Sequence, residues 1–326
     1  MKAVLCKYWG EPASLVIEEV ESPVLKPGEV RVLVHAAGAN FADALMIAGK
    51  YQARPPFPFS PGLEVSGVIG ECAPDVTSVQ LGQRVLAFGD NGGYAEEMIV
   101  PASTVVPIPD EMDFVTAAPF GIAYSTSHVA LTHRGALQDG ESLLVLGAAG
   151  GVGLATVEIG KQLGATVIAA ASSAAKLQVT SEHGADYTVN YSEENLRGRV
   201  REITDGKGAN VIYDPVGGDL FDQALRMLAF EGRLLIIGFA SGRIPEAPAN
   251  RLLLKNASAV GVYWGAYIRF NPQVIRDSME TLLGWYVAGD LRPYVSQTYP
   301  LVEAARALED LLARRAKGRI VITTGR

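Results

Sequence analysis

The feature that most constrains the fold is an apolar run that ends in a cluster of glycines, at residues 143–153. An uninterrupted apolar run suits a buried parallel strand, and apolar residues recur at helical spacing from near Val152. The glycines allow a tight turn and a close approach to a pyrophosphate, which would face the free N–H groups of the helix. Because Ala148 replaces the first glycine of Gly-x-Gly-x-x-Gly, a tight packing turn is the alternative. The dinucleotide contacts expected here are Gly150, Gly151, Val152 and Gly153.

With 326 residues, the chain is long enough for two domains that each bury a sizeable core. Its formal net charge of −7 argues against a nucleic-acid partner, because such binding needs Lys and Arg to neutralise phosphates. No stretch approaches the roughly 20 apolar residues of a membrane span. Only Cys6 and Cys72 could form a disulfide, and none of the 4 histidines forms a His-x-x-x-His pair. The sequence therefore predicts a cytoplasmic protein with no membrane segment, no disulfide framework and no zinc site.

The pattern of apolar residues along the chain changes near residue 120. Before it, short apolar runs separated by Gly and Pro predict a small, mostly β domain with strands at 30–34, 65–69, 84–88 and 97–100. After it, strands at 167–171, 187–190, 209–213 and 233–237 alternate with helices at 174–183, 196–203 and 220–228. This alternation predicts an α/β fold with a doubly wound parallel sheet. The end of the chain, with helices at 272–288 and 301–315 and a strand at 318–322, is expected to return to the first domain.

In an open parallel sheet, ligands bind beyond the carboxyl ends of the strands. Glycines, hydroxyl groups and a cation follow the predicted strands, so they converge on one edge of the sheet. The residues expected to contact a dinucleotide there are Ser172, Ser173, Lys176, Tyr191, Val216, Gly238, Phe239 and Ala240. Tyr191 would flank a phosphate or serve only in packing.

The segment after the second of these strands indicates which dinucleotide binds. An NAD site usually places Asp or Glu about 20 residues after the glycine motif, on the ribose hydroxyls. Residues 166–176 contain no acid and offer Ser172, Ser173 and Lys176, which would bind a 2′-phosphate. The sequence therefore favours NADPH, although the two serines could instead only cap the following helix.

Other catalytic templates do not occur. There is no Gly-x-x-x-x-Gly-Lys-Ser/Thr loop, no Gly-x-Ser-x-Gly elbow and no Tyr-x-x-x-Lys pair. These absences argue against a nucleotide triphosphatase, an α/β-hydrolase and a short-chain dehydrogenase.

Seven segments together carry a resemblance to a known family: 37–43, 49–51, 61–67, 121–126, 147–153, 213–218 and 317–321. Over essentially the whole chain, the sequence resembles the medium-chain dehydrogenase/reductase superfamily and, within it, the zinc-free NADPH:quinone oxidoreductase (zeta-crystallin-like) group. The resemblance implies a Rossmann domain at 120–265 and a mostly β, GroES-like catalytic domain formed by 1–119 with 266–326. The substrate would bind in the cleft between the two domains.

The positions that hold catalytic zinc in the alcohol dehydrogenases of the superfamily correspond to Asn40, Leu63 and Ile122, none of which is a good zinc ligand. Oxidation of an unactivated alcohol needs a metal or a strong base to stabilise the alkoxide. A quinone or an α,β-unsaturated carbonyl needs less help, because its own conjugation accepts the charge. The resemblance thus implies metal-independent hydride transfer from NADPH to such an electrophilic acceptor.

By the same resemblance, Asn40 lies near the nicotinamide and orients a substrate oxygen, unless it only hydrogen-bonds its own loop. Tyr51 would donate a proton to the developing enolate or hydroquinone, since a free phenol titrates at about pH 10. Alternatively, Tyr51 is a half-buried lid residue. Thr126 corresponds to a residue that bonds the nicotinamide carboxamide, or it bonds a carbonyl one helical turn back. His128 is expected to be structural, and so is Glu64.

The aromatic segment 260–267 is expected to provide a cofactor contact at Tyr263, and a sheet edge that pairs in a homodimer. Core packing of Tyr263 and Trp264 is the alternative. Two other functions stay open: an enoyl-CoA-type reductase that uses Arg54 and Arg251 on the CoA phosphate, and an NADPH-binding structural or regulatory protein without turnover.

Overall fold

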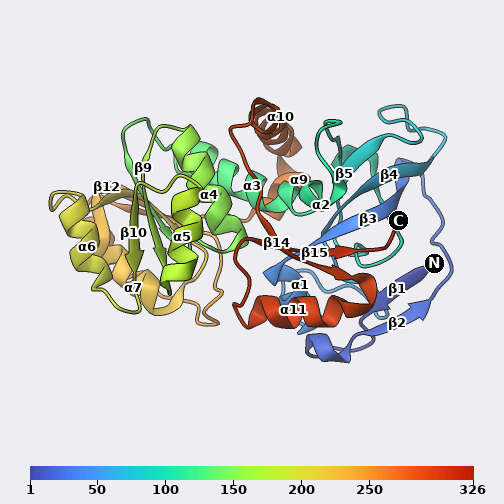
Figure 1. Ribbon diagram of the computed structural model, residues 1–326, viewed down its shortest axis with the longest axis horizontal. Coiled ribbons are helices and arrows are strands. Elements are labelled where there is room, and N and C mark those ends of the chain that lie inside the picture. Colours follow the sequence, from blue (N-terminus) through green and yellow to red (C-terminus); the bar gives the residue numbers. More distant parts are fainter. The chain divides into compact units, whose positions relative to one another are not determined.

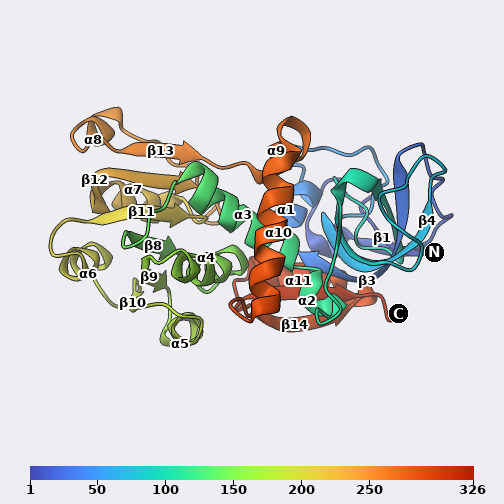
Figure 2. The same ribbon diagram turned by 90° about the horizontal axis from the view of Figure 1, so that it is seen from above.

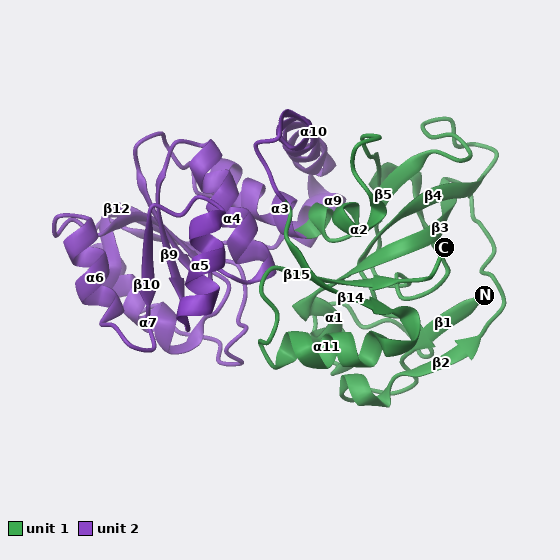
Figure 3. Ribbon diagram, in the orientation of Figure 1, with its two compact units in different colours: residues 1–122, 293–326 green, residues 123–292 purple.

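The computed structural model describes residues 1–326, which divide into two compact units (Figure 3). Unit 1 consists of Met1–Ile122 and Pro293–Arg326, and unit 2 of Ala123–Arg292. Residues 266–292 therefore belong to unit 2, whereas the sequence assigned them to the catalytic domain. The physical reason is a buried hydrogen bond: Ser278 Oγ lies 3.1 Å from Ser125 Oγ, so this helical segment is tied to the start of unit 2.

Unit 2 contains a six-stranded, fully parallel sheet. Its order is β10-β9-β8-β11-β12-β13, which is the 3-2-1-4-5-6 order of a Rossmann fold. The central strands are buried on both faces, which explains why residues 143–146 are all apolar. The strands are β8 (Ser142–Leu146), β9 (Thr166–Ala171), β10 (Tyr187–Asn190), β11 (Ala209–Asp214), β12 (Leu228–Ile236) and β13 (Ser258–Gly261).

Helices cover both faces of this sheet. One face packs against α4, where Gly160 approaches Leu143 and Val167; the other face forms a core with residues of α6 and α7 (Figure 2). The helices of unit 2 are α4 (Gly151–Gln162), α5 (Ala174–Glu182), α6 (Leu196–Ile203), α7 (Gly218–Met227), α8 (Ala249–Leu253), α9 (Trp264–Phe270) and α10 (Pro272–Ala288). Before them, α3 (Phe120–Val129) starts in unit 1 and continues into the π-helical turn η3 (Ala130–Arg134).

Unit 1 is mostly β structure, as Figure 1 shows. Its seven-stranded sheet has the order β14-β15-β3-β4-β5-β7, with β6 also paired to β3, and β1 pairs with β2 separately. The strands are β1 (Lys2–Leu5), β2 (Val16–Glu19), β3 (Glu29–Ala39), β4 (Glu64–Cys72), β5 (Arg84–Phe88), β6 (Glu97–Pro101), β7 (Val105–Pro107), β14 (Val295–Pro300) and β15 (Arg319–Thr323). The doubly wound parallel sheet and the mostly β unit confirm the predicted fold class.

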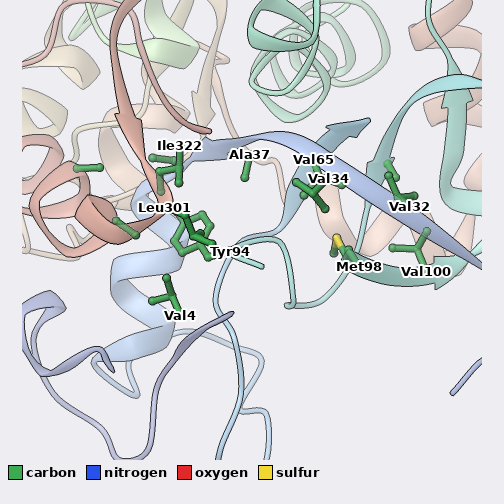
Figure 4. Packing of buried hydrophobic residues seen from close by; sticks show 14 of the residues in the cluster. Val4, Val32, Val34, Ala37, Val65, Tyr94, Met98, Val100, Leu301 and Ile322 are labelled. Carbon is green, nitrogen blue, oxygen red and sulfur yellow. The ribbon is translucent and has the colours of Figure 1, made fainter. Parts of the chain in front are cut away.

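The C-terminal segment closes unit 1. β15 pairs antiparallel with β3, so residues from both ends of the chain share one core, in which Val34, Val65, Leu301 and Ile322 gather near Tyr94 (Figure 4). The predicted helix 301–315 is shorter, because a 3-10 turn precedes it. The helical segments of this unit are η1 (Pro12–Ser14), α1 (Phe41–Ile47), η2 (Ala102–Thr104), α2 (Phe114–Ala117), η4 (Leu301–Glu303) and α11 (Ala304–Leu312). No helix in the chain has the length and apolarity that crossing a bilayer requires.

Candidate active site

The glycine turn between β8 and α4 is tightly packed at Gly153 and leaves space for a ligand at Gly150. A Cβ on Gly153 would lie 2.4 Å from Gly147 O, so only glycine allows this contact between helix and turn. A Cβ on Gly150, the N-cap of α4, would meet only Gly147 O at 3.3 Å. The first N–H groups of α4 have no partner within the helix, and they lie beside this open position. The turn therefore has the form of an anion site at a helix N-terminus.

We expect Gly153→Ala to lower the free energy of unfolding by about 1–3 kcal/mol, the usual cost of overpacking. The backbone must shift at the anion site, so dinucleotide affinity should fall by about tenfold or more. Gly284→Ala in α10 is the control, because nothing lies within 4 Å of its added Cβ. Chemical denaturation and fluorescence titration measure both effects. Unchanged stability and affinity in Gly153→Ala would contradict the assigned role of the turn.

The loops that follow β11 and β12 meet at the carboxyl edge of the sheet, next to the point between β8 and β11 where the strand order reverses. Asp214 Oδ1 accepts the N–H groups of Val216 (2.8 Å) and Gly217 (2.9 Å), which fixes the first loop. The second loop joins it through Ala240 N–H, which donates to Pro215 O at 3.1 Å. Burial raises the pKa of Asp214, and its Oδ2 is buried without a hydrogen-bond partner. This edge thus keeps an unused polar atom where a doubly wound sheet binds ligands.

Residues predicted from these two loops lie together there. Phe239 packs against Gly217, since a Cβ on Gly217 would lie 3.1 Å from the Phe239 ring. Gly238 faces Pro215 O at 3.3 Å from its hypothetical Cβ. Val216 is half-buried, whereas Phe239 is exposed at the edge. The loop geometry brings these side chains to the carboxyl edge, as the strand pattern predicted.

The loop after β9 leaves a serine hydroxyl unused. Ser173 is the N-cap of α5, yet its side chain makes no capping hydrogen bond, so capping alone does not account for it. Lys176 Nζ lies 3.4 Å from Ser172 Oγ, which places an ammonium group beside the Ser172 hydroxyl. Tyr191 packs partly against the core under α6 and α7, so the packing alternative accounts for part of its ring.

Thr126 lies on α3 and is buried. The back-bond to a carbonyl one turn earlier is made by its neighbour Ser127, which donates to Ala123 O at 2.9 Å. Ser127 Oγ also meets Tyr213 Oη and Thr156 Oγ1, so it ties α3 to β11 and α4. The structure shows no such bond for Thr126 Oγ1.

In the aromatic segment 260–267, Tyr263 lies at the surface and Trp264 lies in the core. Tyr263, the N-cap of α9, is 48% exposed, whereas Trp264 is buried and donates to Ser125 Oγ at 2.8 Å. His128 lies nearby within unit 2, and burial lowers its pKa to about 4. Its Nδ1 contacts Ser278 Oγ at 3.1 Å, in agreement with the structural role expected for it.

In unit 1, Asn40 belongs to a buried, charged network. Its Nδ2 donates to Glu64 Oε1 (2.9 Å), and its Oδ1 accepts from Arg319 Nη2 (3.0 Å). Arg319 Nη2 also forms an ion pair with Glu64 Oε1 at 2.7 Å, and both side chains are more than nine-tenths buried. Asn40 therefore bonds residues distant in the sequence, and not only its own loop. Its remaining N–H faces Gly38 O at 3.5 Å, a long contact that a substrate oxygen could replace.

Other groups hold this network in place. Ile122 N–H donates to Glu64 Oε2 at 2.7 Å, which satisfies the second carboxylate oxygen. Burial raises the pKa of Glu64, and the charge of Arg319 opposes that rise. Asp43 accepts from Asn40 N–H (2.7 Å) and Tyr94 Oη (2.8 Å), yet burial raises the pKa of Asp43 to about 7. Both carboxylate oxygens of Glu64 therefore accept hydrogen bonds from neighbouring residues, in agreement with the structural role expected for it.

Tyr51 lies four residues beyond the end of α1, and Asn40 lies at the start of the same helix. The seven residues of α1 rise by roughly 10 Å along the helix axis, from Asn40 to the turn that precedes Tyr51. Tyr51 is half-buried and packs partly against the unit 1 core, so it has the exposure expected for either of its two roles.

The structure also adds residues that the sequence did not single out. Arg319 and Tyr94 make the network around Asn40, and Asp43 is its link to α1. The Asn-x-x-Asp spacing at a helix start was a usable signal for Asp43. Arg319 lies in segment 317–321, one of those that carry the family resemblance, but no local spacing predicts its contacts, because its partners are far away in the sequence.

The residues present fit a dinucleotide. The open glycine position, the unused Ser173 hydroxyl and the orphaned Asp214 Oδ2 all lie at or just beyond the carboxyl ends of strands of one parallel sheet. They do not form a zinc site in unit 1, since Leu63 and Ile122 offer no ligand atom and Asn40 is engaged by Glu64 and Arg319.

Known proteins with similar sequences and structures include dehydrogenases and oxidoreductases. The family model for the alcohol dehydrogenase GroES-like domain matches residues 26–110, and the one for zinc-binding dehydrogenase matches 151–283. A quinone oxidoreductase-like protein 2 homolog of Nematostella vectensis is 43% identical over 99% of this chain and 89% of the relative. A quinone oxidoreductase of Pseudomonas aeruginosa is 35% identical over 98% and 99% of the two chains.

A solved structure, the Escherichia coli quinone oxidoreductase complexed with NADPH, superposes with a TM-score of 0.93 at 27% identity, covering 99% of this chain and 100% of that one. A Rossmann sheet joined to a GroES-like unit whose zinc positions are replaced defines a zinc-free oxidoreductase of the medium-chain dehydrogenase/reductase class. The chain belongs to the quinone oxidoreductase family of that class.

Proposed function

We propose that the protein is a metal-independent reductase that uses NADPH to reduce a quinone or an α,β-unsaturated carbonyl compound. When bound, NADPH supplies the hydride. The observation that carries the proposal is the Asn40–Glu64–Arg319 network, which engages Asn40, one of the positions that by the family resemblance hold zinc in the alcohol dehydrogenases. The family's quinone oxidoreductases, one of them solved with NADPH, support the same choice.

The chemistry of the network limits the acceptor. The Arg319 guanidinium is paired with the Glu64 carboxylate. Unit 1 therefore presents hydrogen-bond donors near Asn40, but no unpaired cation of this network. Asn40 can donate one N–H to a substrate oxygen, and Tyr51 can donate a proton to it. These groups suffice for an acceptor whose own conjugation spreads the negative charge, but not for an unactivated ketone.

Stopped-flow mixing tests this function. NADPH-loaded protein is mixed with 1,4-naphthoquinone, with 2-alkenals and with crotonyl-CoA, and the loss of NADPH absorbance is followed. We expect oxidation with quinones or alkenals. Turnover restricted to the CoA ester would favour the enoyl-CoA alternative. Of the two arginines expected to bind the CoA phosphate, Arg251 donates to Asp222 O inside unit 2. Tight NADPH binding with no turnover on any acceptor would refute a reductase and favour a binding role.

The cofactor preference is proposed to depend on the loop after β9. Ser173→Asp puts a carboxylate beside Ser172 and Lys176, where it would repel a 2′-phosphate. We expect the dissociation constant for NADPH to rise by at least about tenfold while that for NADH changes little. Gln178→Glu, an exposed change on the same helix, is the control for net charge. An equal loss for both dinucleotides would show that this loop does not read the phosphate.

We propose a homodimer that pairs through β13, the last strand of the parallel sheet. Val262 N–H points to β12, where it donates to Ile236 O, so by the period of two Ala259 N–H points away from the sheet. An edge of this kind is a template for a second copy. Light scattering should give twice the 34.6 kDa of one chain, and Ala259→Pro should give the monomer. A monomeric wild-type protein would exclude this pairing.

A further inference from the structure

A small cationic pocket lies in unit 2 at the amino ends of β11 and β12, the edge of the sheet opposite to the candidate dinucleotide site. Its volume is about 190 Å³. The side chains around it include Arg197, Arg201, Lys207, Arg226 and Lys255. No carboxylate is among the lining residues.

The loop between α6 and β11 brings these cations together. Gly208 contacts the junction of α7 and β12, because a Cβ there would lie 2.5 Å from Met227 O. This contact sets Lys207 beside the end of α7, which carries Arg226. Arg201 folds back toward the loop, with its Nε 3.9 Å from a hypothetical Cβ on Gly206.

The positive charge of the pocket is not neutralised by nearby acids. Glu194 and Glu202, the acids that flank α6, both pair with Arg199, outside the pocket. Asp205 and Glu231 are exposed and do not line it. No ion pair involves Arg197, Arg201, Lys207 or Arg226 in the structure of residues 1–326, although the chain carries 35 acidic residues against 28 basic ones.

Helix-end electrostatics explain only part of this cluster. Lys255 Nζ donates to Arg226 O (3.1 Å) and to Leu228 O, so Lys255 caps the C-terminus of α7. Arg201 and Arg226 lie in the last turns of their helices, where cations are favourable.

Helix-end electrostatics do not explain the position of Arg197. It lies in the first turn of α6, where a cation is unfavourable, and one turn before Arg201, where like charges repel. Lys207 lies outside any helix. Burial, and secondarily the charge of Arg197, lower the pKa of Lys255, which also lines the pocket.

We propose that this pocket binds the phosphate groups of a small molecule, at a second site separate from the dinucleotide site. Guanidinium groups from one turn of α6 match the oxygens of a phosphate in a planar, bidentate manner. The pocket is small, which suits a compact anion such as pyrophosphate or a phosphomonoester, and Val200 and Met227 supply an apolar wall.

Calorimetric titration with inorganic pyrophosphate tests the proposal, with and without saturating NADPH. The variant is Arg201→Gln/Lys207→Gln, and the control is Arg269→Gln/Arg276→Gln, which removes two exposed cations of α9 and α10. We expect pyrophosphate to bind wild type and control alike, also in the presence of NADPH. The pocket variant should bind it at least about tenfold more weakly, with an unchanged melting temperature and unchanged NADPH affinity.

Three outcomes would overturn this second site. Pyrophosphate could fail to bind wild type, or it could bind the pocket variant equally well. Its binding could also be abolished by NADPH, which would assign it to the dinucleotide site. A single-stranded oligonucleotide that binds wild type, while pyrophosphate does not, would assign the cluster to nucleic acid instead. These results do not depend on the proposed reductase activity, because none of them measures turnover.

Discussion

Replacing Arg319 by Met is expected to lower the free energy of unfolding by about 3–5 kcal/mol, because it leaves the Glu64 carboxylate buried without its counter-charge. Glu64 is 1% exposed, so water cannot take the place of the guanidinium. Asn40 also loses the donor that holds its Oδ1, and its amide becomes free to rotate. Urea denaturation followed by circular dichroism measures the change.

A double-mutant cycle separates this charge effect from loss of packing. Glu64→Gln/Arg319→Met should be clearly more stable than Arg319→Met alone, because the uncompensated charge has gone. Arg306→Met is the matched control: Arg306 pairs with Glu303 at the surface, where the loss should stay within about 1 kcal/mol. If Arg319→Met cost no more than Arg306→Met, the buried pair would not hold unit 1 together as described.

Tyr51→Phe is expected to reduce turnover by about 10²–10⁴-fold, the usual contribution of a positioned general acid. The change removes one hydroxyl and keeps the ring that packs on the unit 1 core, so folding and NADPH affinity should be nearly unchanged. Single-turnover kinetics with a quinone give the rate, and fluorescence titration gives the affinity. Tyr8→Phe, at an exposed tyrosine of the same unit, is the control.

Asn40→Ala completes this test. It should also slow turnover more than it weakens NADPH binding if Asn40 orients the substrate oxygen. Equal losses of turnover and affinity in both variants would instead indicate that Tyr51 and Asn40 serve folding. Full activity of Tyr51→Phe would show that the proton comes from another donor or from water.

Much of unit 2 could be predicted because its signals are local. Residues 143–146 are apolar because β8 is buried on both faces, and Gly153 is required by the carbonyl 2.4 Å from its Cβ position. Local patterns also placed Ser172, Ser173 and Lys176 after a strand, although the unused hydroxyl of Ser173 could be seen only in the structure.

The boundaries of the two units were less predictable. The pattern of α10 shows a helix but not the surface that it packs on. Its place in unit 2 depends on Ser278, whose hydroxyl meets Ser125 and His128. Such contacts join segments more than a hundred residues apart, so no spacing in the sequence reveals them.

By itself, the sequence determined the parallel sheet with its glycine turn, because strand patterns are local properties. The replacement of zinc ligands at Leu63 and Ile122 followed from the resemblance to the alcohol dehydrogenases of the superfamily. Only the tertiary structure decided which charges meet. β15 pairs with β3 so that Ile320 lies opposite Ala39, and this register sets Arg319 beside Asn40 and Glu64. Because these charges are buried, water cannot solvate them, and each must pair with a partner inside the fold or destabilise it.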